Sequence, residues 1–179
     1  AHYRATETVV ALRQIEALIN EQPNNPYLWE LKGQVLFESG RAAEAVPAHR
    51  RSVELRPDSP LLMINLGPAL PALDDPPQVD AAITLINRAV ALENDNPLAW
   101  RLLAEAYDRK GDPGMARLAA AEQNFALGQS QQARIFAMRA REILPRNTPQ
   151  WRRATDIVLV SNPSPDDLRS VGETPAPRG

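Results

Sequence analysis

The chain has 179 residues, of which 44% are hydrophobic and 23% are charged, and it contains no cysteine. This composition is typical of a folded globular protein, and it excludes disulfides and thiolate metal sites. The net charge of -2, with both signs interspersed, excludes a basic surface for nucleic acid. No apolar run approaches the roughly 20 residues of a membrane-spanning helix.

Seventeen prolines divide the sequence into segments with helical periodicity. Proline is tolerated in the first turn of a helix and not in its interior, and the segments between prolines carry apolar residues at the i, i+3, i+4 and i+7 spacing of amphipathic helices. We therefore predict an all-α fold without strands. Its nine or so helices are expected at residues 5–21, 26–38, 42–55, 60–72, 78–92, 97–110, 113–127, 130–144 and 149–160.

Two parts of the chain depart from this regular pattern. Pro68 and Pro71 fall inside the predicted helix 60–72, where each costs about 3 kcal/mol, so this helix is expected to be kinked or short. The last segment, residues 161–179, is rich in Pro, Ser, Asp and Gly and has few apolar residues. We expect it to be a disordered tail.

An internal repeat emerges when the predicted helices are compared. Gly33 and Gly67 are 34 residues apart, and Trp29 and Trp100 occupy the same phase at the start of their helices. Small residues recur in the second helices, at Ala45, Ala82 and Ala116. This period and these residue types are those of the tetratricopeptide repeat, a tandem helix hairpin that stacks into a solenoid.

The predicted repeat domain covers residues 1–160. Its repeats lie near 26–59, 60–96, 97–127 and 114–147, the last two overlapping, with flanking helices at 5–21 and 149–160. Large residues should fill the gaps between helical pairs, and glycines should permit close approach of helices or end them. The residues assigned these structural roles are Trp29, Gly33, Gly67, Trp100, Gly111, Gly128 and Trp151.

Function in such repeats resides on the concave face, which exposed positions of the first helices line. These positions here form a mixed apolar, acidic and basic set, to which we assign binding of a protein or peptide partner: Tyr27, Glu30, Gln34, Phe37, Glu38, Leu61, Ile64, Asn65, Leu98, Arg101, Glu105, Asp108 and Arg109. Capture of a terminal carboxylate, as in chaperone-binding tetratricopeptide proteins, is not expected, because only Asn65 matches the required set and Glu30 stands where a Lys is needed. A merely solvated face is the alternative.

No pattern in the sequence predicts catalysis, a metal site or a cofactor. The two histidines, His2 and His49, are 47 positions apart and form no HExxH motif. We expect His49 to pack in the core and His2 to lie on the surface. Asp74 and Asp75 lack the alternating oxygen ligands and the glycine of a calcium loop, so they predict a solvated turn.

Three stretches carry a more specific resemblance, namely NPYLWELKGQ, GMARLAAAEQ and PQWRRATDI. They resemble the C-terminal repeat region of bacterial periplasmic zinc metalloproteases of the outer-membrane quality-control type, whose N-terminal domain carries the HExxH motif. The resemblance covers roughly residues 2 to 160, and none of the catalytic residues of that family is present. It implies a periplasmic location and an upstream protease domain, for which this chain would bind substrates or partners.

Three alternatives stay open at this stage, one of which is a hydrolytic activity of the chain itself, although we expect none. The chain could be a freestanding adaptor that recruits a peptide or a membrane-associated complex. Its concave face could instead be occupied by a protease domain or by its own tail. A monomer is the expected state, because the segments 5–21 and 149–160 should cover the two ends of the solenoid.

Overall fold

The computed structural model of the chain describes residues 2–172, with side chains described over 7–169 and 171–172. Over these residues it consists of α-helices and one short 3-10 helix and contains no strand, which confirms the all-α prediction. The chain forms two compact units, Ala1–Asn94 and Asp95–Gly179. The helices of the predicted domain 1–160 are therefore distributed over both units.

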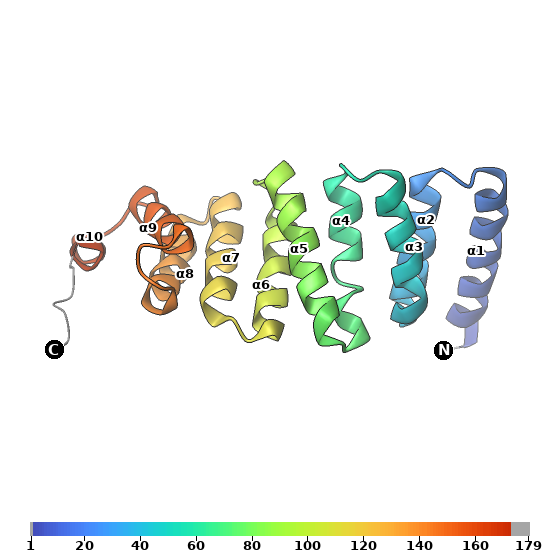
Figure 1. The fold of residues 1–179 in the computed structure, drawn as a ribbon, viewed down its shortest axis with the longest axis horizontal. Helices are drawn as coiled ribbons and strands as arrows, with labels where there is room; N and C mark the ends of the chain where they lie inside the picture. Colours follow the sequence, from blue (N-terminus) through green and yellow to red (C-terminus); the bar gives the residue numbers. More distant parts are fainter. Residues whose placement is uncertain (1, 173–179) are drawn as a thin grey trace. The chain divides into compact units, whose positions relative to one another are not determined.

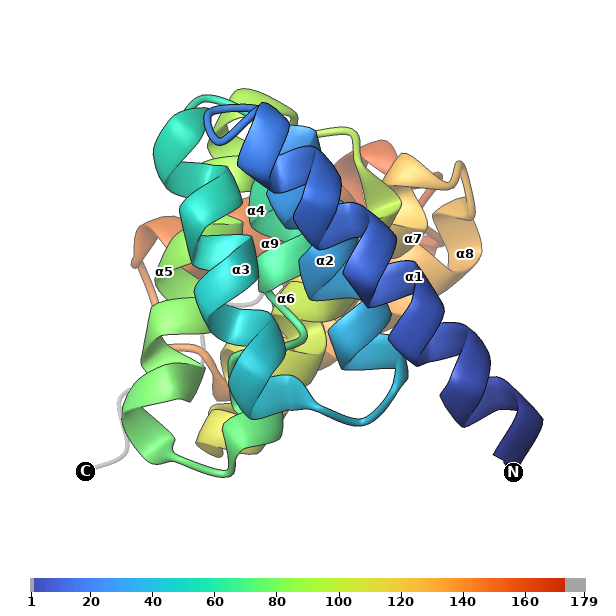
Figure 2. The same cartoon turned by 90° about the vertical axis from the view of Figure 1, so that its right-hand side faces the viewer.

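Unit 1 is a series of helices in which each packs against its neighbour in the chain (Figures 1 and 2). Its elements are α1 (His2–Glu21), α2 (Pro26–Glu38), α3 (Ala42–Leu55), α4 (Pro60–Leu66), the 3-10 helix η1 (Pro71–Leu73) and α5 (Pro76–Leu92). Part of its core is a cluster of Val46, Leu66, Ala69, Leu70 and Ala82. Figure 2 shows α1 in front of α2.

Unit 2 follows the same sequential packing. Its helices are α6 (Pro97–Lys110), α7 (Pro113–Ala126), α8 (Ser130–Ile143), α9 (Pro149–Val160) and α10 (Pro165–Gly172). Ala121, Ala133, Ala137, Ala140 and Ala154 are fully buried in its core. Because alanine side chains are small, the backbones of α7, α8 and α9 can approach one another closely.

Polar caps and prolines set the starts of most helices. The Asn96 side chain accepts hydrogen bonds from the backbone amides of Leu98 and Ala99, at 3.1 and 3.2 Å, and Pro97 begins α6. Asp112 and Thr148 cap α7 and α9 in the same way. Each cap satisfies amides that have no partner inside the helix, and Pro has no amide to satisfy.

The close approach of α2 and α3 depends on Gly33. A Cβ atom at this position would lie 2.6 Å from the imidazole carbons of His49, which is itself only 2% exposed. Gly111 acts differently: it ends α6 with a φ of 77°, a left-handed conformation that residues with a Cβ atom seldom adopt. These two glycines therefore have distinct physical roles.

The segment that contains Pro68 and Pro71 is not one helix over 60–72. Helix α4 ends at Leu66, a turn follows over residues 67–70, and Pro71 begins η1. Neither proline can donate to the helical hydrogen bonds, so the helix is short, as the two prolines predict. Asp74 and Asp75 lie in an exposed turn, with Asp74 at a φ of 54°.

The predicted tail 161–179 falls only partly within the described residues. The structure places α10 over Pro165–Gly172, where the sequence analysis expects disorder, and residues 173–179 lie outside the described range. The helix begins with a capping box, because the side chains of Ser164 and Asp167 each bond the backbone amide of the other. This local cap gives the segment a helical start that its low apolar content does not predict.

Candidate partner-binding surface

The residues assigned to partner binding fall into two sets. Those from Tyr27 to Asn65 lie on α2 and α4 of unit 1, and those from Leu98 to Arg109 lie on α6 of unit 2. Each set is a surface of its own unit.

In unit 1 the structure brings Glu30 of α2 and Asn65 of α4 together. The Asn65 amide donates a hydrogen bond of 2.9 Å to Glu30 Oε1. Partial burial raises the pKa of the Glu30 carboxyl above its ordinary value, and the hydrogen bond from Asn65 opposes this rise. Farther along α2, Gln34 donates to Glu38 at 2.9 Å. The surface therefore contains an oriented carboxylate next to an amide.

Exposed apolar side chains lie on the same two helices. Leu61 of α4 is 57% exposed and Tyr27 of α2 is 46% exposed. The Tyr27 hydroxyl accepts a hydrogen bond from Arg56, whose guanidinium carbon lies 5.8 Å from the centre of the tyrosine ring. An apolar contact surface beside directional polar groups is the usual composition of a protein-binding surface.

Two residues of the predicted set are placed differently in the structure. Ile64 is only 3% exposed, so its assignment to an accessible binding surface is wrong. Phe37 is half-buried and packs against the apolar clusters of unit 1. The sequence PLLMINL of α4 is apolar on nearly every side, and a helix of this kind is buried rather than amphipathic.

In unit 2 the predicted residues of α6 all lie at the surface. Leu98 is 44% exposed, and Arg101 forms an ion pair with Glu105 one helical turn away. Asp108 and Arg109 are exposed near the end of the helix. This set contains two positive and two negative side chains, so it favours no strongly acidic or basic partner.

The three tryptophans are half-buried. The Trp29 indole donates a hydrogen bond of 2.8 Å to the carbonyl of Pro23, which ties the α1–α2 loop to α2. Trp151 packs on the core of unit 2, and the guanidinium of Arg141 lies 4.7 Å from its ring centre. These contacts are structural ones within each unit.

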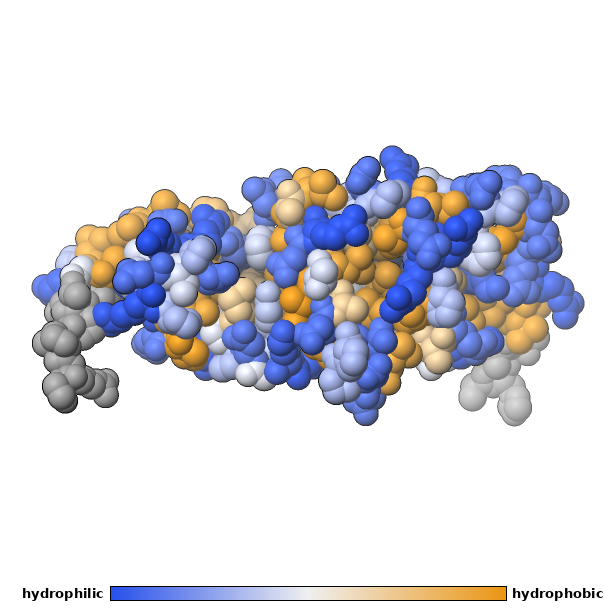
Figure 3. All heavy atoms as spheres, in the orientation of Figure 1, coloured by the Kyte–Doolittle hydropathy of each residue, from blue (hydrophilic) through white to orange (hydrophobic). Residues whose placement is uncertain are grey.

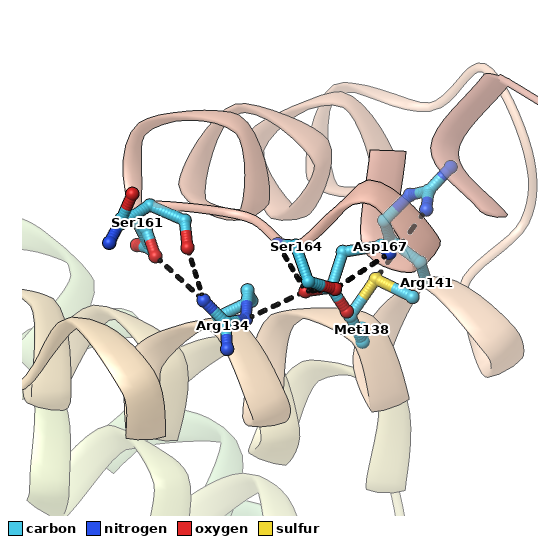
Figure 4. A network of polar contacts seen from close by, with 7 residues as sticks. Arg134, Met138, Arg141, Ser161, Ser164 and Asp167 are labelled. Carbon is cyan, nitrogen blue, oxygen red and sulfur yellow. Dashed lines mark hydrogen bonds and ion pairs between the residues drawn. The ribbon is translucent and has the colours of Figure 1, made fainter. Parts of the chain in front are cut away.

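Two arginine sites in unit 2 are not predicted by the sequence pattern. Arg153 of α9 makes a two-pronged ion pair with the buried Glu122 of α7, with distances of 2.6 Å from Nε to Oε1 and 2.8 Å from Nη2 to Oε2. Arg134 and Arg141 of α8 contact the segment that follows α9 (Figure 4). The sequence pattern does not predict which residues these arginines contact, because each contact joins residues about 30 positions apart.

The described residues form neither a metal site nor a membrane-spanning helix. Among the described residues, no three His, Asp or Glu side chains gather closely enough to hold a metal ion. No helix within residues 2–172 is long and apolar enough to cross a membrane. The His2 side chain lies outside the described side chains.

Comparison with known proteins bears on the family and on the fold. A tetratricopeptide repeat family matches residues 1–60 and 78–126, which is more than half of the chain. The cytochrome c-type biogenesis protein CycH of Bradyrhizobium diazoefficiens is 32% identical over 98 residues. That match covers 55% of this chain and 27% of CycH, so the chain spans little more than a quarter of this relative.

Several solved structures share the fold. MamA from Desulfovibrio magneticus RS-1 is 18% identical with a TM-score of 0.62, and the match covers 96% of this chain and 91% of that one. YrrB, described as a tetratricopeptide protein with an unusual peptide-binding site, is 16% identical with a TM-score of 0.60 over 93% of this chain and 84% of that one. A thermophilic tetratricopeptide protein of Thermus thermophilus is 17% identical with a TM-score of 0.53 over 88% of this chain and 94% of that one.

At these identities the structural matches show the fold alone. Tetratricopeptide repeats present extended surfaces for protein or peptide partners and are typically not catalytic. The helical pairs, the repeat period and the family match agree with one another. The chain belongs to the tetratricopeptide repeat family of protein-interaction modules.

Proposed function

We propose that this chain is the partner-binding module of a protein that acts in the biogenesis of c-type cytochromes. The observation that carries the binding role is the surface of α2 and α4, where Leu61 and Tyr27 are exposed beside the Glu30–Asn65 pair. The pathway is suggested by the similarity to CycH, whose name assigns that protein to cytochrome c-type biogenesis. In this proposal the chain acts without a metal or cofactor of its own.

The partner is a polypeptide with an accessible apolar segment. The two exposed side chains supply apolar contact area, while the Glu30 carboxylate and the Asn65 amide supply directional hydrogen bonds. In this proposal the partner is a c-type cytochrome polypeptide before haem attachment. It is therefore the natural probe.

The test is binding of a haem-free c-type cytochrome, kept reduced, to the purified chain by isothermal titration calorimetry. We expect micromolar affinity, and we expect Leu61→Asp to weaken it at least about tenfold, since a buried unpaired carboxylate costs more than about 1.4 kcal/mol. Leu92→Asp is the matched control, because Leu92 is 55% exposed but lies on α5, outside the predicted surface. Equal losses in both variants, or no binding by the unaltered chain, would contradict the proposal.

A second candidate is the repeat module of a periplasmic zinc metalloprotease. Its support is the resemblance of segments such as NPYLWELKGQ and PQWRRATDI to that family. The coding region upstream of Ala1 separates the two candidates: an HExxH motif there, together with zinc-dependent cleavage of an unfolded substrate by the longer protein, favours the protease. A freestanding adaptor is favoured if the upstream region encodes neither a protease nor a sequence like that of CycH.

A further inference from the structure

Helix α8 carries a row of side chains that hold the segment after α9. Arg134, Met138 and Arg141 follow one another at spacings of four and three residues, so they lie along one face of the helix (Figure 4). This α8 face is distinct from the surfaces on α2, α4 and α6.

Arg134 contacts the segment at three points. Its Nη1 donates to the backbone carbonyls of Ser161, at 3.2 Å, and of Asn162, and its Nε lies 3.1 Å from Oδ2 of Asp167. The side chains of the ion pair are only 20% and 23% exposed. Arg134 thus binds two features of the segment: the backbone carbonyls that precede a helix, and a carboxylate in the first turn of that helix.

The same carboxylate also begins α10. Asp167 Oδ2 accepts hydrogen bonds from the amide and the hydroxyl of Ser164, at 2.8 and 2.7 Å, and the Asp167 amide donates back to the Ser164 hydroxyl at 3.2 Å. These bonds, with a smaller contribution from Arg134, lower the pKa of the Asp167 carboxyl. The Asp167 side chain therefore both caps the start of α10 and binds Arg134.

The other end of α10 lies near Arg141. Arg141 Nη2 is 3.5 Å from the carbonyl oxygen of Val171, and the Val171 side chain packs on the buried apolar cluster of unit 2, as Met138 and Trp151 also do. Carbonyl groups at the end of a helix carry partial negative charge, which a cation stabilises. The α8 face thus offers one arginine for each end of a short helix and an apolar surface between them.

Helix α10 is weakly anchored for an element of a folded unit. It has eight residues, too few to be stable alone, and Leu168 is 47% exposed. Figure 3 shows apolar side chains gathered at the end of unit 2 that carries α9 and α10, where Leu159 and Val160 are also exposed. Because α10 makes few buried apolar contacts, we expect it to have a low free energy of local unfolding.

We propose that the α8 face is a docking surface for a short acidic helical segment of a partner protein, and that α10 occupies this surface until the partner displaces it. The pattern recognised is that of α10 itself: a Ser or Thr helix cap, a carboxylate three residues later and an apolar residue four residues after the carboxylate, as in Ser164, Asp167 and Val171. This inference goes beyond the function proposed above, because it concerns a different surface and does not depend on the pathway.

A tethered occupant has a predictable effect on affinity. A short linker gives α10 an effective concentration on the order of 1 mM at the α8 face. If α10 and a separate segment each bind this face with a Kd of about 0.1 mM, competition from α10 should weaken binding of the separate segment about tenfold. Removing the contacts of α10 should therefore increase the affinity for a peptide supplied separately. A surface without a binding role would show no such gain.

The experiment measures fluorescence anisotropy of a labelled peptide with the sequence of residues 161–172, SNPSPDDLRSVG, added to the full chain. Asp167→Ala in the chain removes the carboxylate's bonds to Ser164 and the ion pair with Arg134, and it leaves the α8 face unchanged. We expect this variant to bind the peptide about tenfold more tightly than the unaltered chain does. Equal affinity for the two chains, or no binding by the variant, would overturn the proposal.

Charge specificity is tested in the Asp167→Ala background. Adding Arg134→Glu should weaken peptide binding at least about tenfold, and a peptide with Lys in place of Asp167 should bind this double variant better than the original peptide does. Arg139→Glu is the matched control, because Arg139 lies on the same helix but outside the α8 face. Equal weakening by Arg134→Glu and Arg139→Glu would overturn the proposal, because binding would then depend on net charge and not on the α8 face.

Discussion

Replacing Gly33 with alanine tests the packing of α2 against α3 directly. The new Cβ atom would lie 2.6 Å from Cγ and Cδ2 of His49 and 2.7 Å from Nδ1, so the buried imidazole or the helix must move. Overpacking of this kind costs about 1–3 kcal/mol, and alanine in a helix interior recovers about 1 kcal/mol relative to glycine. We expect a net loss of up to about 2 kcal/mol in the free energy of unfolding.

The assay is urea unfolding followed by circular dichroism, in two backgrounds. With His49→Ala already present, the imidazole is gone and the same Gly33→Ala change should become stabilising, by up to about 1 kcal/mol, because only the helix propensity remains. This reversal of sign is the signature of direct contact. The same destabilisation in both backgrounds would refute the explanation that His49 requires a glycine at position 33.

Two further predictions concern buried charge. Burial lowers the pKa of His49 to about 4. As the pH falls from about 6.5 to about 4, the imidazole therefore becomes protonated in the unfolded chain while it stays neutral in the folded chain. The free energy of unfolding should therefore fall by about 3 kcal/mol over this range, relative to a His49→Ala variant measured in parallel, and equal pH profiles would contradict this. Arg153→Met should destabilise the chain by about 2–3 kcal/mol in urea unfolding, because it leaves the Glu122 carboxylate buried and unpaired. The exposed Arg152→Met should change stability by less than about 0.5 kcal/mol, and similar losses in both variants would argue against a role for the ion pair.

The helix boundaries can be predicted from the sequence because their causes are local. Pro26, Pro97 and Pro149 each follow a residue that caps the helix, and the predicted helices 26–38, 97–110 and 149–160 agree with the structure at both ends. Helix α5 begins at Pro76 and not at residue 78, since both prolines of its first turn are compatible with helix. The capping box at the start of α10 is an equally local signal, but a low apolar content obscures it.

The exposure of individual side chains is harder to predict. Ile64 fits the phase of a first-helix surface position and is nevertheless buried, because the neighbours of α4 cover a helix that is apolar on most sides. The ion pair between Glu122 and Arg153 and the contacts of Arg134 join residues far apart in sequence. Such contacts follow from how helices pack, and one sequence alone contains no local trace of them.

The two proposed surfaces differ in chemistry, and this difference makes them separable. The surface of α2 and α4 exposes Leu61 and Tyr27 around a carboxylate and an amide, whereas the α8 face presents arginines to an acidic helix. A substitution that acts by contact should therefore affect only the ligand of its own surface. If Leu61→Asp also weakened binding of the α10 peptide, we would test for a loss of stability by urea unfolding of the same variant. Measuring both ligands on both variants thus distinguishes a binding contact from a loss of stability.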